Sequence, residues 1–429
     1  MPPNAIEFLN DRDHALRRAL VEELHVRRFP PFCAPLEMTQ ILMLTADEDR
    51  AAVRRHAEEL VVHYGGTPPA KGRYFSVQLA GVHFVWESHT EFSSYSFIRT
   101  GPFEVPFKRY VLLELPLDWV EALPGRTIRA TQVAILDRSA AAPTDTFLSA
   151  HFDMNEIVCA DVSEGEARLW SNFRLHEDGF GRLLVQDLAL HGGGDTSRLL
   201  QRVQEIGNYR NMALLGLPLA HTFDPELTSL EGRLASLTRE VADNNGNDDA
   251  LFQNLSALSA NLARLTADTR YRMSATRAYA QIVSERVAGL QPQRVPGYQT
   301  LIDFTERRLA PAVRTCESFM ERLEDLSERT SWASSLIRTR IETTLSRQNT
   351  DLLRSMNQRT QLQLRLQQTV EGLSVLAISY YAVGILGYVG KSLAHVAPGF
   401  DAPLFLGAIA PVIVAVVWYC IRRMRRPEK

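Results

Sequence analysis

Hydrophobic and polar residues change their pattern twice along the chain. Residues 1–195 contain short alternating or β-rich runs, among them MTQILMLTA, GRYFSVQLAG and TIRATQVAILD, and one helical stretch that starts at Asp47 and ends in a glycine pair. Turns containing Gly and Asp between such runs favour hairpins in a mixed sheet. Residues 196–295 place apolar side chains three and four positions apart, which predicts helices. We therefore expect an α/β domain followed by a helical region.

Two polar breaks divide the helical part of the chain. The segment ADNNGNDD precedes a helix expected from Asp248, and QPQRVPG ends the helical region; a further helix is expected near Pro225. After QPQRVPG, residues 296–371 keep a helical pattern without interruption, although Pro311 could kink the helix or mark a junction. We expect residues 296–371 to form one long stalk helix.

Two uncharged apolar runs follow the stalk. They cover residues 372–390 and 403–421, and each approaches the ~20 residues that a helix needs to cross ~30 Å of hydrocarbon. Residues 391–402, with a lysine, a proline and a glycine, are expected to form a short external turn. Arginines precede the first run and fill the tail 422–429, and basic residues mark the cytoplasmic side. The chain is therefore expected in the lipid bilayer of a bacterial inner membrane, with both termini in the cytoplasm.

The stalk carries an apolar seam with heptad spacing, formed by Leu345, Asn349, Leu352 and Met356. An asparagine in such a seam can set the register and the number of chains in a coiled coil. A helix that packs against its own domain would show the same spacing, so both interpretations stay open. Because the helix runs directly into the first apolar run, we favour self-association. Two spans alone cannot enclose a pore, so a pore would need several chains.

One face of the first apolar run could line a polar path. Its candidate residues are Glu371, Ser374, Ile378, Tyr381, Ile385 and Tyr388. Glu371, at the cytoplasmic end, would concentrate cations. Alternatively the tyrosines form an interfacial belt and Ser374 bonds its own backbone, but mid-span Tyr381 fits a belt poorly. Small residues permit close packing of membrane helices, and we expect this role for Gly384, Gly387 and Gly407.

Polar residues in the N-terminal half give two further candidates. Glu87, His89 and Glu91 alternate along an expected strand and so project from one face, where they could bind a divalent cation or transfer protons. The alternative is a sheet face whose charges pair with arginines. We expect the segment EIGNYRNMALL, with Glu205, Tyr209, Arg210 and Met212, to be a packed helix that bears a buried polar contact.

Composition and motifs exclude several classes of function. The net charge of −3 and the pI near 6.4 give no basic field for nucleic acid. The four cysteines lie far apart and form no CxxC pair, which favours a reducing compartment. The chain has no phosphate-binding GxxxxGK[ST] loop, no GxGxxG, and no GxSxG elbow to accompany HGGGD at His191. We therefore expect neither an enzyme nor a required cofactor. A divalent cation is the one small ligand that the sequence suggests.

Several segments resemble a bacterial membrane-anchored family known as domain of unknown function thirty-four twenty-two. They are LHVRRFPPF from Leu24, VWESHTEFSSYSF from Val85, EIGNYRNMALLGLPLA from Glu205, and the long stretch from Arg347 into the first apolar run. The resemblance extends over essentially the whole chain, and it implies no particular activity.

The order of parts is similar to that of the CorA-like divalent-cation channels. The expected fold class is an α+β cytoplasmic domain, a helical region, a long stalk helix and a C-terminal two-helix transmembrane hairpin. The resemblance implies a homopentamer whose first spans line a cation pore. Where that family carries a Gly-Met-Asn signature, this chain has Tyr381 to Gly384 and then Gly387 and Tyr388, so magnesium selectivity does not transfer. The leading hypothesis is a cation channel; the alternative is an anchored scaffold or sensor whose hairpin only anchors and oligomerises it.

Overall fold

The computed structural model describes most of the chain, in two units. The described residues are 12–17, 20–21, 29–46, 48–69, 72–108, 111–243, 247–396 and 401–424. The first unit comprises Met1–Ala242 and Asn254–Trp332, and the second comprises Asp243–Gln253 and Ala333–Lys429. Asp47, the expected start of the first helix, lies outside the described residues.

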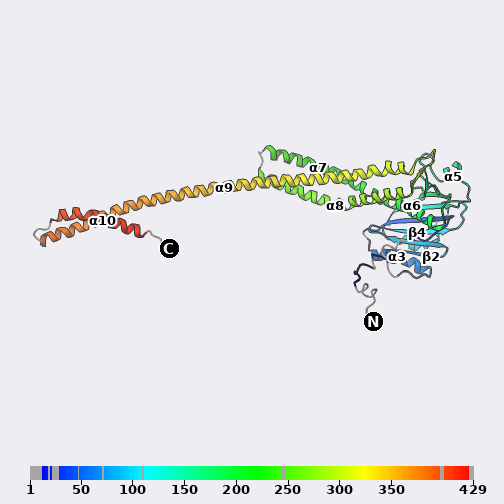
Figure 1. The fold of residues 1–429 in the computed structure, drawn as a ribbon, viewed down its shortest axis with the longest axis horizontal. Helices are drawn as coiled ribbons and strands as arrows, with labels where there is room; N and C mark the ends of the chain where they lie inside the picture. The colour runs from blue at the N-terminus through cyan, green and yellow to red at the C-terminus, as the bar shows by residue number, and fades with distance from the viewer. Residues whose placement is uncertain are drawn as a thin grey trace, which may run out of the picture. The chain divides into compact units, whose positions relative to one another are not determined.

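A mixed sheet of nine strands forms the centre of the first unit in the described part of the chain (Figure 1). Its strands are β1 (Leu36–Leu44), β2 (Tyr74–Leu79), β3 (Val82–Ser88), β4 (Phe92–Thr100), β5 (Arg126–Leu136), β6 (Val158–Val162), β7 (Ala167–Ser171), β8 (Gly181–Asp187) and β9 (Gln293–Arg294). Their order is β2-β3-β4-β1-β5-β8-β7-β6-β9. Strands β5 and β8 pair in parallel, whereas the other neighbouring strands pair antiparallel. The expectation of a mixed sheet with hairpins is confirmed.

Helices cover both faces of this sheet, as the alternation of apolar residues along β1 requires. On one face, Ile41 packs with α3 (Arg50–His63) and the short helix α4 (Leu117–Glu121). On the other face, Met38 packs with α6 (Gly193–Leu214). The small helices η1 (Val111–Glu114) and α5 (Asp145–Ser149) lie in the connections. Burial of apolar surface in these two layers supplies the main stabilisation of the unit.

Three long helices continue the first unit. They are α7 (Gly216–Asp243), α8 (Asp248–Gly289) and the beginning of α9 (Leu301–Val396), which run side by side (Figure 1). Arg322 joins α9 to α7 by ion pairs with Asp224 at 2.5 Å and Glu231 at 2.8 Å. The expected start at Asp248 is confirmed, whereas α7 begins at Gly216 and contains Pro225.

The early start of α7 has a packing reason. A Cβ at Gly216 would lie within 3.2 Å of Cys316 Sγ and closer still to Thr276 Oγ1, so the glycine lets α7 approach α8 and α9. Helix α6 also begins earlier than expected, at Gly193 rather than at residue 196. Asp195, in its first turn, accepts a hydrogen bond from His191 N.

The second unit contains the rest of α9 and helix α10 (Ala402–Met424). By length and composition, the helical stretches Leu301–Ser392 of α9 and Pro403–Ile421 of α10 each contain an apolar segment long enough to cross a membrane. Helix α9 begins at Leu301, after the expected start of the stalk at residue 296, then runs unbroken through the first span and ends at Val396, beyond the expected end at Gly390. Of the expected turn and tail, residues 397–400 and 425–429 lie outside the described residues.

Candidate functional site

The two apolar helices of the second unit contact each other along one side of α9. That side includes Ser379, of which 4% is exposed, and Gly387, where a Cβ would lie 3.5 Å from Leu406. Close contact was also expected for Gly384 and Gly407, but a Cβ at either position would meet nothing within 4 Å among the described residues. Only Gly387 among the three therefore faces the neighbouring helix within this chain.

The remaining side of the first span is uncovered. The exposed side chains of this span include Ile378, Tyr381, Ile385 and Tyr388, which are four of the six residues expected to line a polar path. Ser374 Oγ donates a hydrogen bond to Val370 O at 2.9 Å, the backbone contact that was the alternative to pore lining. Glu371 accepts a hydrogen bond from Gln367 at 3.3 Å. The face thus presents apolar side chains and two tyrosine rings.

The heptad seam of the stalk is also exposed. Leu345, Asn349, Leu352 and Met356 all have exposed side chains in the second unit. Ile337, earlier in α9, is fully buried. Intramolecular packing therefore explains the apolar spacing at Ile337 but does not explain it at the four seam residues.

The acidic and histidine row does not form a metal site in the described part of the chain. Strand β3 ends at Ser88, so Glu87 belongs to the strand while His89 and Glu91 lie in the turn before β4. His89 Nε2 lies 4.0 Å from a Glu87 carboxylate oxygen. Glu91 is instead held by Arg272 and by the hydroxyl of Tyr279 at 2.8 Å, both on α8. No group of three His, Cys, Asp or Glu residues that could hold a metal ion occurs among the described residues.

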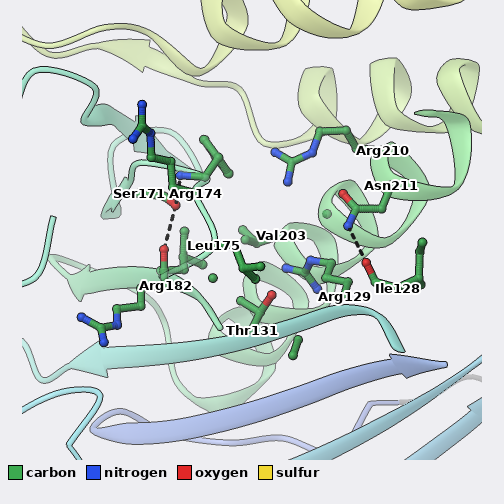
Figure 2. Close-up of a pocket in the computed structure, with 15 residues that line it drawn as sticks. Ile128, Arg129, Thr131, Ser171, Arg174, Leu175, Arg182, Val203, Arg210 and Asn211 are labelled. Carbon is green, nitrogen blue, oxygen red and sulfur yellow. Dashed lines mark hydrogen bonds between the residues drawn. The ribbon is translucent and has the colours of Figure 1, made fainter. Parts of the chain in front are cut away.

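A cavity between the sheet and α6 gathers arginines instead. It has a volume of about 160 Å³ and is lined by β5, by β8 with the loop before it, and by α6. Figure 2 shows the guanidinium groups of Arg129, from β5, and Arg210, from α6, directed toward this cavity. The guanidinium groups of Arg174 and Arg182 point away from it (Figure 2). Arg174 pairs with Glu156, and Arg182 pairs with Asp178 at 2.7 Å.

Arg129 is fixed by uncharged partners. Its Nη1 donates to the amide oxygens of Gln40 at 2.9 Å, Gln204 at 2.6 Å and Asn208 at 2.8 Å. Gly207 makes room for the guanidinium, because a Cβ there would lie 2.5 Å from Arg129 Cζ. Burial, together with the charge of Arg210, lowers the pKa of Arg129 to about 9.

Arg210 rests on aromatic rings. Its Cζ lies 4.9 Å from the ring centroid of Phe173 and 6.0 Å from that of Phe304, and the two rings stack at 4.5 Å. Phe173 adopts a left-handed backbone conformation with φ 51°, which is uncommon for a residue with a side chain. Burial lowers the pKa of Arg210 to about 10. Within the described residues, neither Arg210 nor Arg129 forms an ion pair with a carboxylate.

The sequence located only part of this cavity. The segment EIGNYRNMALL was expected to carry a buried polar contact, and it supplies Gly207 and Arg210. It did not indicate the partners, because Arg129 and Phe173 come from distant parts of the chain. A small residue three positions before an arginine, on the face of a helix that packs on a sheet, is the signal that sequence reasoning missed.

The comparison with known families gives one match. Residues 12–427 match the model of the family described as "Protein of unknown function (DUF3422)". The match confirms the resemblance that the motifs indicated and covers nearly the whole chain. No curated protein matches the chain.

Proposed function

Because the chain belongs to the DUF3422 family, whose function is unknown, we propose from its own geometry that it is a self-assembling, membrane-anchored scaffold or sensor. The observation that carries this proposal is the uncovered face of the first span, where Tyr381 is exposed in mid-span. Polar groups inside a membrane generally face other protein or a water-filled cavity rather than lipid. A second copy of the chain would supply such a neighbour.

The stalk supports the same proposal. Its exposed seam, Leu345 to Met356, has the heptad spacing with which helices of separate chains associate. An interface through the seam and the first span would lie along one helix, α9. We place the protein in the inner membrane with both termini in the cytoplasm, since arginines flank the outer ends of both spans.

The mass of the complex in nanodiscs tests self-assembly. We expect several chains per complex and a shift toward monomer in Tyr381→Ala. Tyr419→Ala is the matched control, since Tyr419 is an exposed tyrosine on α10, whereas the proposed face belongs to α9. A monomeric wild-type protein, or an equal loss of assembly in the two variants, would contradict the proposal.

The second candidate function is a CorA-like homopentameric cation channel. The observation that favours it is Glu371 at the end of the uncovered face, where a ring of carboxylates from several chains would attract divalent cations. Cation flux into liposomes should then fall in Glu371→Gln and Tyr381→Ala. Wild-type complexes that assemble as pentamers but carry no flux would leave the scaffold or sensor as the function. We propose no catalytic activity for either assembly.

A further inference from the structure

The cavity beside α6 contains two cationic side chains without a counter-ion. Four arginines line it, and Arg174 and Arg182 are paired with carboxylates. Arg129 donates only to neutral amide oxygens, and Arg210 has no hydrogen bond to another described residue. Charges in a protein interior are normally paired, because removing them from water is costly. Two uncompensated guanidinium groups at one cavity therefore indicate a site for an anion.

Local packing holds both groups in place. Three amide acceptors and the missing side chain at Gly207 fix the position of Arg129. The stacked rings of Phe173 and Phe304 pack against the guanidinium of Arg210 and leave its N–H groups available. A preorganised donor loses little conformational entropy when it binds a ligand. Burial lowers the pKa of both arginines, and the charge of Arg210 also lowers that of Arg129.

The size and the donors of the cavity restrict the ligand. A volume of about 160 Å³ is close to the ~150 Å³ of a cavity that holds one benzene molecule, so the ligand has only a few non-hydrogen atoms. The hydroxyl of Thr131, which is 6% exposed, comes from β5 between the two guanidinium groups and the loop after β7. Because these donors lie on a strand, β5, and on a helix, α6, they can bind a ligand whose oxygens point in several directions.

We propose that this cavity binds a phosphate group, held by the guanidinium groups of Arg129 and Arg210. Phosphate carries a charge of about −1.5 to −2 at neutral pH, which balances two guanidinium groups, and arginine binds it through paired hydrogen bonds. Its tetrahedral oxygens can meet donors from both β5 and α6, whereas the oxygens of one carboxylate lie in a single plane. The site is independent of the proposed self-assembly and does not require it.

Calorimetric titration of the full-length protein in detergent with inorganic phosphate tests the site, in a chloride buffer of matched ionic strength. We expect binding that weakens by about tenfold or more in Arg210→Gln, since that variant loses hydrogen bonds between charged groups. Arg174→Gln is the matched control: Arg174 also lines the cavity, but its guanidinium points away and pairs with Glu156. Tighter binding of glycerol phosphate than of phosphate would support a phosphate ester as the natural ligand.

A second measurement separates loss of the site from loss of folding. Without phosphate, Arg210→Gln should unfold at the same urea concentration as the wild type or a higher one, because the variant removes an uncompensated charge. With phosphate, the unfolding midpoint of the wild type should rise and that of the variant should not. No binding by the wild type, an equal loss in Arg174→Gln, or tighter binding of succinate than of phosphate would overturn the proposal.

Discussion

Replacing Gly207 by alanine tests whether the guanidinium group of Arg129 occupies the position described. Alanine is favoured over glycine inside a helix by ~1 kcal/mol, so the substitution alone would stabilise α6. The added Cβ, however, would lie 2.5 Å from Arg129 Cζ and Nη2, about 1 Å closer than the ~3.5 Å of an ordinary contact. Arg129 would have to withdraw from its three amide acceptors.

The cost of that withdrawal exceeds the gain in helix propensity. Overpacking a well-filled site costs ~1–3 kcal/mol, and a weakened hydrogen bond to a charged group adds ~1.5–3 kcal/mol. Against a gain of ~1 kcal/mol, we expect Gly207→Ala to destabilise the first unit by about 3 kcal/mol. Gly232→Ala is the matched control: Gly232 lies inside α7, and a Cβ there would meet nothing within 4 Å. This variant should be more stable than the wild type by ~1 kcal/mol.

Urea unfolding followed by tryptophan fluorescence reports on this unit. Trp86, Trp119 and Trp170 are buried in it, with at most 8% of each exposed. The two alanine variants should therefore move the unfolding midpoint in opposite directions. If Gly207→Ala raises the midpoint as Gly232→Ala does, Arg129 is not packed against α6 and the cavity does not have the described form.

Three further predictions concern other parts of the chain. Glu91→Gln should lower the stability to urea by about 3 kcal/mol, because it leaves Arg272 without its buried partner. Burial lowers the pKa of His56 below 6.5, so the folded state binds fewer protons than the unfolded state. The contribution of His56 to stability should be full above pH 6.5 and should fall as the pH drops below it. In urea titrations at several pH values, His56→Gln should reduce this pH dependence of stability. Asn349→Leu should raise the stability of the assembled complex but broaden the distribution of chain numbers seen by native mass spectrometry, since a polar residue in a heptad seam fixes the number of chains.

The sequence predicted the elements whose signals are local. Helix α8 begins at Asp248 after a polar break, and α9 follows a long uninterrupted helical pattern, as expected. Strand β3 was expected to extend as far as Glu91, but it ends at Ser88 because the chain turns there into β4. The alternating pattern continues through the turn, since Glu91 is buried by α8 rather than by the sheet. Periodicity alone cannot distinguish those two causes of burial.

The cavity depended on contacts between distant segments. Arg210 was expected in a buried polar contact, but its supporting rings belong to Phe173 and Phe304, far apart in the sequence. Arg129 lies in an alternating strand, and the sequence pattern alone predicts an ordinary solvent-facing residue at its position. The pairing of β5 with β8 and the packing of α6 on both give it a different environment. These are tertiary contacts, which local propensity does not encode.

The parallel pairing of β5 with β8 has a consequence for the order of folding. It joins two antiparallel groups of strands, β2-β3-β4-β1-β5 and β8-β7-β6-β9. A parallel pair closes only after the intervening chain has been ordered, so contacts of this kind form slowly. The cavity is lined from both groups and from α6, and therefore exists only once the two halves have joined. A ligand of this cavity would bind only the completed sheet. It would therefore slow the separation of the two strand groups without speeding the formation of either group.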